Sequence, residues 1–473
     1  MDNLNKGNFK SNFGFLMAAV GSAVGLGNIW GFPYKMGANG GFAFLLIYII
    51  LAIVAGYPLM LAEISLGRKT RKAAVEAYRT AHPKFAINGV FATIVPFFLL
   101  CFYCVLGGIV IRYMLANLGD IFHASWGVHG QASDAFFGGF ISNMGGMMLF
   151  TALFLLMTSY VVFRGIENGI EKFCSIGMPL LALMLIITDI RCCTLPGASG
   201  GLNFMFKPDF SVFAGTGWFK VFATAGSQMF FSISLASGAL IAFGSYMKKE
   251  DDMEKSAMLV PFLDTIAALL AGLAVIPAVF SAGIEPSGGP GLLFVSLQTV
   301  FDSMGPVGPF FGFIFYLLVF VAAFSSSIGM MEGGISAIMD WQIKKGQGPN
   351  RFKVTALISI TTLIGAALVS LDQLGGNAGM WKPFGLGSWL DVFDLGAEGI
   401  LMPLGGLICA ILFGWVRRGY LDDEIQKSSD YKTKGFVNFC LRYIIPVFMA
   451  LIVFVQISTF FFSDTAWFQA LMG

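Results

Sequence analysis

The sequence predicts an all-α membrane protein in which eleven helices cross the bilayer and the first ten form two inverted repeats of five. The first reason is composition. Of 473 residues, 56% are hydrophobic and 12% are charged, whereas an average soluble domain has about 25% charged residues. The second is that the hydrophobic residues occur in runs of roughly 20 or more, the length that crosses the hydrocarbon layer. The third is that two runs are interrupted at corresponding positions of the two halves, which is typical of inverted repeats.

Each predicted span is an apolar run between polar breaks. The spans lie at about residues 13–36, 41–67, 89–118, 145–163, 173–190, 218–247, 256–283, 307–341, 353–371, 391–416 and 437–462. The first repeat covers residues 13–190 and the second covers 218–416, with an extracellular connection at 191–217. A segment rich in Gly and Pro at about 284–306 is expected to form short helices over the outer face, as a lid or as a plain loop.

The distribution of basic residues predicts the orientation, because Lys and Arg are retained in cytoplasmic loops. Most of the 29 Lys and Arg residues fall on one side of the predicted bilayer. Residues 1–12 and 417–436 are therefore expected in the cytoplasm, and residues 437–473 contain the eleventh span and a periplasmic C-terminus. No Asn-x-Ser/Thr acceptor occurs, which is compatible with a bacterial inner membrane and with lipid as the surrounding partner.

Several classes of function are disfavoured. The net charge is +2 and the basic residues are dispersed, so the sequence shows no clustered basic surface of the kind that binds nucleic acid. No GxxxxGK[ST] motif is present, which argues against ATP as an energy source. No nucleophile stands beside a base, so an enzyme is not expected. An ion channel would usually repeat one pore motif around an oligomer axis, whereas this chain has two unlike interruptions.

The two interruptions are the strongest pointer to a binding site. They are Gly21–Asn28 in the first span and Ser232–Gly238 in the sixth. Unwinding at mid-membrane frees carbonyls and amides that lipid cannot satisfy, so ions, substrate or water must take their place. Carbonyls can hold a cation and amides attract a carboxylate. Sodium together with a zwitterionic amino acid suits this pair, although small residues can also merely permit close helix packing.

Neutral oxygens and buried charges add candidates. Asn28 and the run Ser325–Ser327 offer the oxygens that a hard cation such as sodium prefers, and the His and Cys clusters that zinc or copper would need are missing. Ionisable residues within membrane spans are functional candidates, with helix–helix hydrogen bonding as the alternative. This set comprises Glu63, Asp264, Glu332, Asp394 and Glu398, with Lys35 and Arg112 as cationic partners.

Short stretches are more specific than the overall pattern. They are Gly21–Asn28 with Phe32–Pro33, Gly40–Gly41, Pro58–Glu63, Gln228–Ser232 and Ser325–Ser326. On these residues the chain resembles the neurotransmitter:sodium symporter family, also called solute carrier family six, in its bacterial branch with eleven transmembrane helices. The resemblance implies a five-plus-five inverted-repeat transporter fold with unwound helices 1 and 6. It implies a sodium-coupled symporter that imports an amino acid by alternating access, or alternatively a sodium-dependent sensor or an amino-acid-gated channel.

The resemblance also implies two sodium sites. The first would use the Ala23 carbonyl, Asn28, Ser232 and Asp264. The second would use the carbonyls of Gly21, Val24 and Ala322 with the hydroxyls of Ser325 and Ser326. An ungapped alignment places Leu263 at the family's sodium-binding Asn, and a one-residue adjustment that selects Asp264 is favoured. A carboxylate there resembles bacterial members in which an acid replaces chloride, so chloride is not expected to be required.

For the substrate, the resemblance implies that the carboxylate meets the amides of Leu26 and Gly27 and the hydroxyl of Tyr103. The ammonium group would face Ala23, Phe231, Ser232 and Ser234. The remaining lining would be Ser22, Leu99, Leu106, Ser237, Ser326 and Met330. Gly25 stands where monoamine transporters have Asp, which favours an amino acid. Ser237 stands where relatives usually have a bulky residue, which favours a large hydrophobic or aromatic side chain.

Two gates are implied in the same way. On the cytoplasmic side, Lys6 and Asp340 resemble the inner gate pair, with Phe9 in place of the usual aromatic residue. On the outer side, the family's Arg is replaced by Gly31, while its acidic partner is expected to be Asp394. Lys35 lies four residues after Gly31, on the same helix face, so it is expected to reach Asp394. The alternative is that Lys35 extends to the periplasmic surface.

Overall fold

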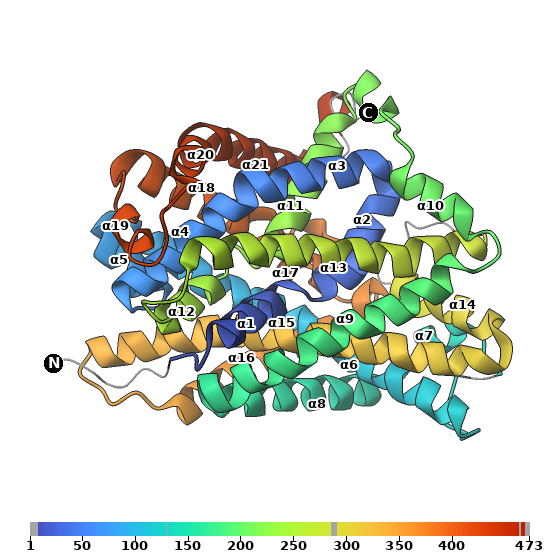
Figure 1. Cartoon of the computed structure of the whole chain (residues 1–473). Helices are drawn as coiled ribbons and strands as arrows, with labels where there is room; N and C mark the ends of the chain where they lie inside the picture. The colour runs from blue at the N-terminus through green and yellow to red at the C-terminus, as the bar shows by residue number, and fades with distance from the viewer. Residues whose placement is uncertain (1–7, 129, 285–290, 463–464, 469–473) are drawn as a thin grey trace.

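The computed structural model describes residues 8–128, 130–284, 291–462 and 465–468. Within these residues all regular structure is helical and no strand occurs, which confirms the predicted all-α class. Figure 1 shows many of the long helices running in roughly the same direction across the view, with the C-terminal helices α20 and α21 along the top.

Nine of the predicted spans are helical segments long and apolar enough to cross a membrane within the described residues. They are Phe42–Thr70, Pro83–Ile121, Met144–Phe163, Ile166–Cys193, Met253–Ser281, Gly305–Lys344, Arg351–Gly375, Trp389–Val416 and Lys434–Thr459. The first span is a bent pair, Asn12–Ala23 and Gly27–Ala38, with an angle of 46° between its halves. The sixth is divided into two shorter helices. The two exceptions are the spans in which the sequence predicts interruptions.

The helices of the first half are α1 (Asn12–Ala23), α2 (Phe32–Ala38), α3 (Phe42–Leu51), α4 (Tyr57–Thr70), α5 (Ala74–Ala81), α6 (Ala86–Ile121), α7 (Ser133–Ser142), α8 (Met144–Phe163), α9 (Lys172–Cys193) and α10 (Ala198–Phe206). Those of the second half are α11 (Trp218–Ser232), α12 (Ala239–Tyr246), α13 (Met253–Ser281), α14 (Leu297–Ser303), α15 (Gly308–Lys344), α16 (Arg351–Leu371), α17 (Trp389–Asp394), α18 (Met402–Ile411), α19 (Asp422–Ile425), α20 (Lys434–Phe439) and α21 (Ile445–Phe462).

Wider π-helical turns connect several of these helices. They are Gly27–Gly31, Ala52–Gly56, Ile166–Glu171, Leu292–Ser296, Leu395–Leu401, Leu412–Val416 and Cys440–Ile444. Single 3₁₀ turns occur at Pro83–Phe85, Ser211–Ala214, Gly305–Val307, Gln373–Gly375 and Pro383–Gly385. Part of the predicted lid, residues 285–290, lies outside the described residues, and α14 belongs to the part that is described.

Burial separates central from peripheral helices. In the most apolar stretch of α6, 83% of residues are buried inside the protein, against 33% in α8. The helices α6 and α15 pack together along much of their length, and α1 packs on α15. Because α8 exposes Leu149, Leu153 and Leu156, it has the apolar outer face of a helix that contacts lipid. The centre of the helix packing therefore lies around α1, α6 and α15.

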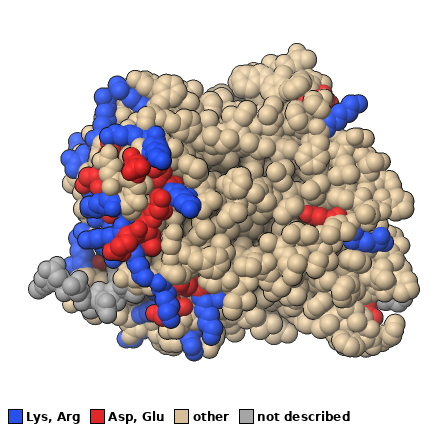
Figure 2. Space-filling model, in the orientation of Figure 1, with Lys and Arg blue, Asp and Glu red and all other residues tan. Residues whose placement is uncertain are grey.

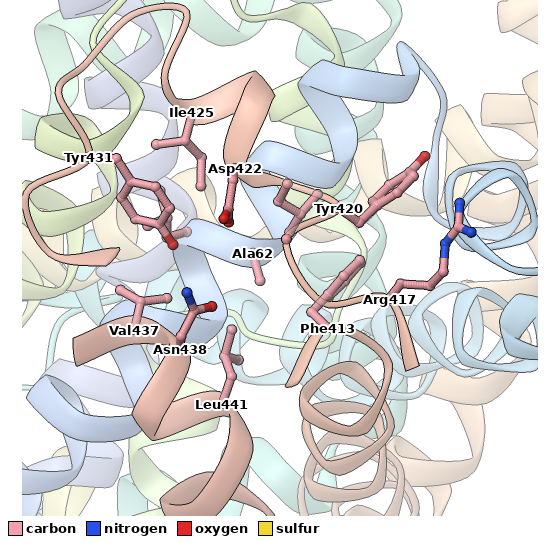
Figure 3. Close-up of a pocket in the computed structure, with 13 residues that line it drawn as sticks. Ala62, Phe413, Arg417, Tyr420, Asp422, Ile425, Tyr431, Val437, Asn438 and Leu441 are labelled. Atoms are coloured by element: carbon pink, nitrogen blue, oxygen red, sulfur yellow. The ribbon is translucent and has the colours of Figure 1, made fainter. Parts of the chain in front are cut away.

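Charged residues gather at one end of the molecule. Figure 2 shows most Lys, Arg, Asp and Glu side chains at the end that holds the N-terminus, beside a wide belt without charge. At this end the predicted loop 417–436 docks on α4 through a buried ion pair, in which Arg68 Nε donates to Glu424 Oε1 at 3.0 Å. A small cavity beside this loop is lined by Ala62, Phe413 and Tyr431, among others (Figure 3). It contains none of the predicted site residues.

Candidate functional site

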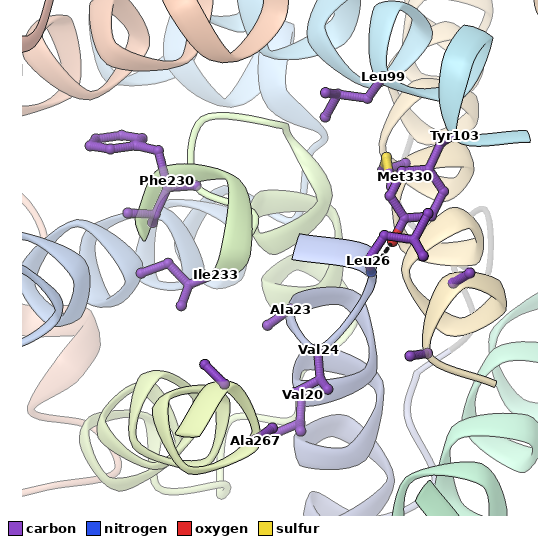
Figure 4. Close-up of a cluster of buried hydrophobic side chains, with 14 of the residues drawn as sticks. Val20, Ala23, Val24, Leu26, Leu99, Tyr103, Phe230, Ile233, Ala267 and Met330 are labelled. Atoms are coloured by element: carbon purple, nitrogen blue, oxygen red, sulfur yellow. Dashed lines mark hydrogen bonds between the residues drawn. The ribbon is translucent and has the colours of Figure 1, made fainter. Parts of the chain in front are cut away.

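The break in the first span leaves residues 24–26 outside the helix, and side chains satisfy the backbone groups that this exposes. The Leu26 amide donates to the Tyr103 hydroxyl of α6 at 2.8 Å, as drawn in Figure 4. The Gly25 amide donates to Asn28 Oδ1 at 2.9 Å. The predicted partners of a substrate carboxylate, the Leu26 amide and the Tyr103 hydroxyl, are thus adjacent.

The break in the sixth span lies directly beside the first. Ser234 and Ala236 both have a φ of 55° and Gly238 has a φ of 75°, so the chain passes through the left-handed region and cannot continue as a helix. The Ser234 hydroxyl donates to the carbonyl of Ser22 at 2.8 Å. The buried Glu63 accepts the Ala236 amide at 3.0 Å. The tertiary structure therefore joins the two breaks and satisfies their freed groups.

A cavity lies where the two breaks meet. Its lining comprises Ser22, Ala23, Gly25, Gly27, Leu99, Tyr103, Phe231, Ser234, Ser237, Ser326, Met330 and Met402. Every predicted substrate residue lines it except Leu26, Leu106 and Ser232. The space that the centre of a water molecule can occupy in this cavity is about 10 Å³. The cavity thus has room for about one water molecule. The lining is apolar apart from hydroxyls and backbone groups, and it contains no charged side chain.

Two lining residues were not predicted to line the pocket. Gly25 was considered only for its lack of a carboxylate. In the structure a Cβ at this position would lie 2.2 Å from Ser326 Oγ and 2.4 Å from Tyr103 OH. Met402 stands in the apolar run of span ten, where no sequence signal separates it from lipid-facing neighbours. It reaches the cavity from the N-terminus of α18.

The first oxygen cluster surrounds Asp264, which is fully buried in α13. Asn28 Nδ2 donates to Asp264 Oδ1 at 2.7 Å, and the Ser232 hydroxyl lies 3.0 Å from Oδ2. The Tyr48 hydroxyl donates to the same carboxylate at 3.0 Å. Asp264 rather than Leu263 therefore faces Asn28 and Ser232, in the register that the adjusted alignment selects. Tyr48 was missed because its own sequence context is a uniform apolar run.

The second oxygen cluster joins α1 to α15. The Ser326 hydroxyl lies 3.2 Å from the carbonyl oxygens of both Gly21 and Val24. The Ser325 hydroxyl donates to the Ala322 carbonyl at 3.0 Å. All five residues are buried. The structure therefore brings the Gly21 and Val24 carbonyls to the Ser326 hydroxyl, while the bond from Ser325 to Ala322 lies within α15.

The donor chemistry of both clusters suits a hard cation. Within the described parts of the chain, no group of three or more His, Cys, Asp or Glu residues converges as a transition-metal site would require. The clusters instead offer carbonyls, hydroxyls, one amide and one carboxylate, which are the oxygens that hard cations prefer. A buried carboxylate with only neutral donors around it, as at Asp264, favours a bound cation.

A vestibule adjoins the cavity at Phe231, which lines both. It has a volume of about 490 Å³, and its lining includes Phe231, Lys35, Asp394 and Glu398. Lys35 forms an ion pair with Glu398, not with Asp394 as the sequence led us to expect. Glu398 is also held by the Ser227 hydroxyl at 2.8 Å. Glu398 follows Asp394 by one helical turn, so both acids share the face that lines the vestibule.

The side chain of Gln228 lies against Gly31. A Cβ at Gly31 would lie 2.9 Å from Gln228 Oε1. The Gln228 side chain is buried and donates through Nε2 to the Gly27 carbonyl at 2.7 Å. Gln228 thus lies against the position of the family's Arg, and the cation reaches the vestibule from Lys35 instead.

On the charged side, the predicted inner gate is seen in part, because Lys6 lies outside the described residues. Phe9 is fully buried, with its ring 5.5 Å from that of Phe15 and 5.8 Å from that of Phe243. Asp340 Oδ2 accepts the Ala73 amide at 2.6 Å. These contacts close the N-terminal end of α1 against α12 and bring α5 to α15.

Two broken helices that meet around a small cavity, with cation-type oxygen clusters beside it, define a membrane transporter coupled to a cation. A family model described as the sodium:neurotransmitter symporter family matches residues 6–132 and 136–469. The chain belongs to this family, whose members are sodium-dependent secondary transporters and not enzymes.

Relatives and a solved structure agree with this assignment. The chain is 33% identical over 464 residues to the uncharacterised sodium-dependent transporter YhdH of Bacillus subtilis, covering 94% of this chain and 96% of the relative. It is 33% identical to an uncharacterised sodium-dependent transporter of Haemophilus influenzae, covering 97% and 99%. The crystal structure of MhsT in complex with L-phenylalanine matches with a TM-score of 0.86 and 35% identity, covering 96% of this chain and all of that chain. The five-plus-five fold with unwound helices 1 and 6 is thereby confirmed.

The position of Gly25 leads to a test of the cavity. Gly25→Ala places a methyl group against Ser326 Oγ and Tyr103 OH, so both hydroxyls must leave the positions they hold beside the breaks. We expect binding of an amino-acid substrate to weaken by at least about tenfold, since ~1.4 kcal/mol is lost when such a contact is displaced. The measurement is equilibrium binding to purified protein. The control is Gly139→Ala, where an added Cβ meets nothing within 4 Å. Equal binding by both variants would exclude this cavity.

Proposed function

We propose that the protein imports a hydrophobic amino acid with a bulky or aromatic side chain, driven by sodium through alternating access. It is a sodium-dependent symporter of its family, and the proposal concerns its substrate, its ions and its gates. The observation that carries the proposal is the cavity at the two breaks, whose lining has backbone amides and hydroxyls but no charge.

The lining supports the class of substrate. The Leu26 amide and the Tyr103 hydroxyl can bind a carboxylate, and Leu99, Met330 and Met402 offer apolar contacts to a side chain. A charged side chain would be left unpaired there at large cost. The similarity to MhsT, solved with L-phenylalanine, supports the same class. Because the cavity has room for about one water, a bulky substrate requires the lining to move apart, as alternating access provides.

The two oxygen clusters support sodium as the coupled ion. One ion would be held by Asp264, Asn28 and Ser232, together with the Ala23 carbonyl. The other would be held by the second oxygen cluster, in which the Gly21 carbonyl of α1 meets the Ser326 hydroxyl of α15. Sodium at either cluster would favour the conformation in which its ligands are together, since a ligand shifts the equilibrium toward the state that it binds better. Asp264 supplies a negative charge without chloride.

The charge distribution supports the proposed orientation. The end with most Lys and Arg (Figure 2) would lie in the cytoplasm because positive residues are retained there. The N-terminus would then lie in the cytoplasm and the C-terminus in the periplasm. The bacterial relatives are consistent with a bacterial inner membrane.

Uptake into proteoliposomes tests the function directly. A radiolabelled aromatic amino acid should accumulate only with an inward sodium gradient, because the proposed sodium clusters share α1, α11 and α15 with the cavity. Replacing chloride by gluconate should leave the uptake rate unchanged, since Asp264 is the local anion. Substrate binding without accumulation would show a sensor, and loss of uptake without chloride would refute the assigned role of Asp264.

Variants of Ser237 test the proposed preference for a substrate with a bulky side chain. The Ser237 side chain is small, and its hydroxyl already donates a hydrogen bond to the Ser234 carbonyl at 2.7 Å. Ser237→Phe should lower competition by tryptophan relative to alanine by at least about tenfold, because each methylene group denied a contact costs ~0.8 kcal/mol. Ser237→Ala, which removes only the hydroxyl, should keep the ranking. A wild-type ranking that already favours alanine would contradict the proposal.

The Lys35–Glu398 pair is proposed as the outer gate. Its side chains are 19% and 5% exposed, so Lys35→Gln leaves a nearly buried carboxylate without its cation. We expect sodium-driven uptake to fall about tenfold or more, with Lys35→Arg retaining most of it. Lys207→Gln, at an exposed position of the outer connection, is the control for loss of charge. Normal uptake by Lys35→Gln would mean that the pair does not gate the vestibule.

A further inference from the structure

We propose that the groove between α8, α9 and α15 binds one anionic phospholipid, with its phosphate between Arg164 and Lys172. The groove has a volume of about 420 Å³, within the usual range for small-molecule sites. It shares no lining residue with the substrate cavity. The proposal therefore does not depend on which substrate is carried.

The walls of the groove are exposed and apolar, as expected of a surface that contacts acyl chains. Tyr160 is 61% exposed, Ile176 is 65% exposed and Leu180 is 43% exposed. Val321 of α15 forms part of the floor. The distance along α9 from Lys172 to Leu180 is about 12 Å at 1.5 Å per residue. The apolar part is thus long enough for a stretch of acyl chain and is far larger than a free anion needs.

The polar end of the groove is basic. Arg164 directly follows α8, and Lys172 begins α9, so the two cations come from opposite sides of the groove. Neither forms an ion pair with any described residue, and no carboxylate lines the groove. The Arg164 guanidinium instead contacts the Tyr160 hydroxyl at 3.4 Å. Two unpaired cations at the end of an apolar groove complement a phosphate with an acyl chain below it.

The neighbouring acids are already engaged by the N-terminal segment. Glu167 pairs with Lys10 at 3.6 Å, and Glu171 accepts the amides of Lys10 and Ser11 at 2.7 and 3.2 Å. Both carboxylates therefore have partners in the N-terminal segment, and neither lines the groove. A lipid in this groove would connect α8 to the end of α9 that lies beside the start of α1.

The test compares lipid retention and thermal stability of the purified full chain. Native mass spectrometry of protein offered equal phosphatidylglycerol and phosphatidylcholine should show one preferentially retained phosphatidylglycerol. Phosphatidylglycerol should also raise the melting temperature above that in phosphatidylcholine alone. In Arg164→Gln/Lys172→Gln, retention should fall by about tenfold or more, since each basic residue near the headgroup contributes substantially to anionic lipid binding.

Matched variants separate the groove from surface charge. Lys84→Gln/Lys249→Gln removes two exposed cations at the same end of the molecule, outside the groove, and should retain the lipid. Leu180→Trp keeps both cations but fills the apolar part, and it should lose the lipid. Each variant must melt like wild type in phosphatidylcholine to count as folded. Equal loss in the two double variants, full retention by Arg164→Gln/Lys172→Gln, or complete displacement of the lipid by inorganic phosphate would overturn the proposal.

Discussion

The structure depends on one constraint: a helix that unwinds within a bilayer must find partners for its backbone groups from other parts of the protein. The first break is satisfied by Tyr103 of α6 and by Asn28, and the second by Glu63 of α4. Each partner comes from a helix that must therefore sit beside a break. The packing of α4 and α6 around the breaks is in this sense a consequence of hydrogen bonding as much as of apolar contact.

The same partners bring the cavity and the two oxygen clusters together. Val24 belongs to the first break, and its carbonyl faces Ser326, whereas Asn28 belongs to the next turn and faces Asp264. Ser326 also lines the cavity. An ion or a substrate that changes the position of one of these groups changes the backbone that the others share. Coupling between ion and substrate thus has a short structural route through residues 21–28.

Buried charges in the described residues are of more than one kind. Some are paired between helices, as Lys35 is with Glu398, Arg68 with Glu424 and Arg351 with Glu332. Asp264, deep in α13, has only neutral donors. This difference fits the cost of desolvation: a pair can be buried when both members are present, whereas a lone carboxylate requires donors and a cation. Asp264 differs in this way from the charges that connect helices, and among the described residues it shares the lack of a cationic partner with Glu63, which accepts the Ala236 amide.

The sequence by itself determined the all-helical class, the spans and the positions of the two breaks, because apolar run length and the Gly and Ser clusters are local properties of the chain. Through its motifs it also indicated the residues that line the cavity. Only the tertiary structure decided that Glu398 rather than Asp394 pairs with Lys35, that Tyr48 reaches Asp264, and that Met402 and Gly25 line the cavity. Within an apolar span every face looks alike in sequence, since lipid and protein interior are equally apolar. Which face turns inward depends on partners that are hundreds of residues away.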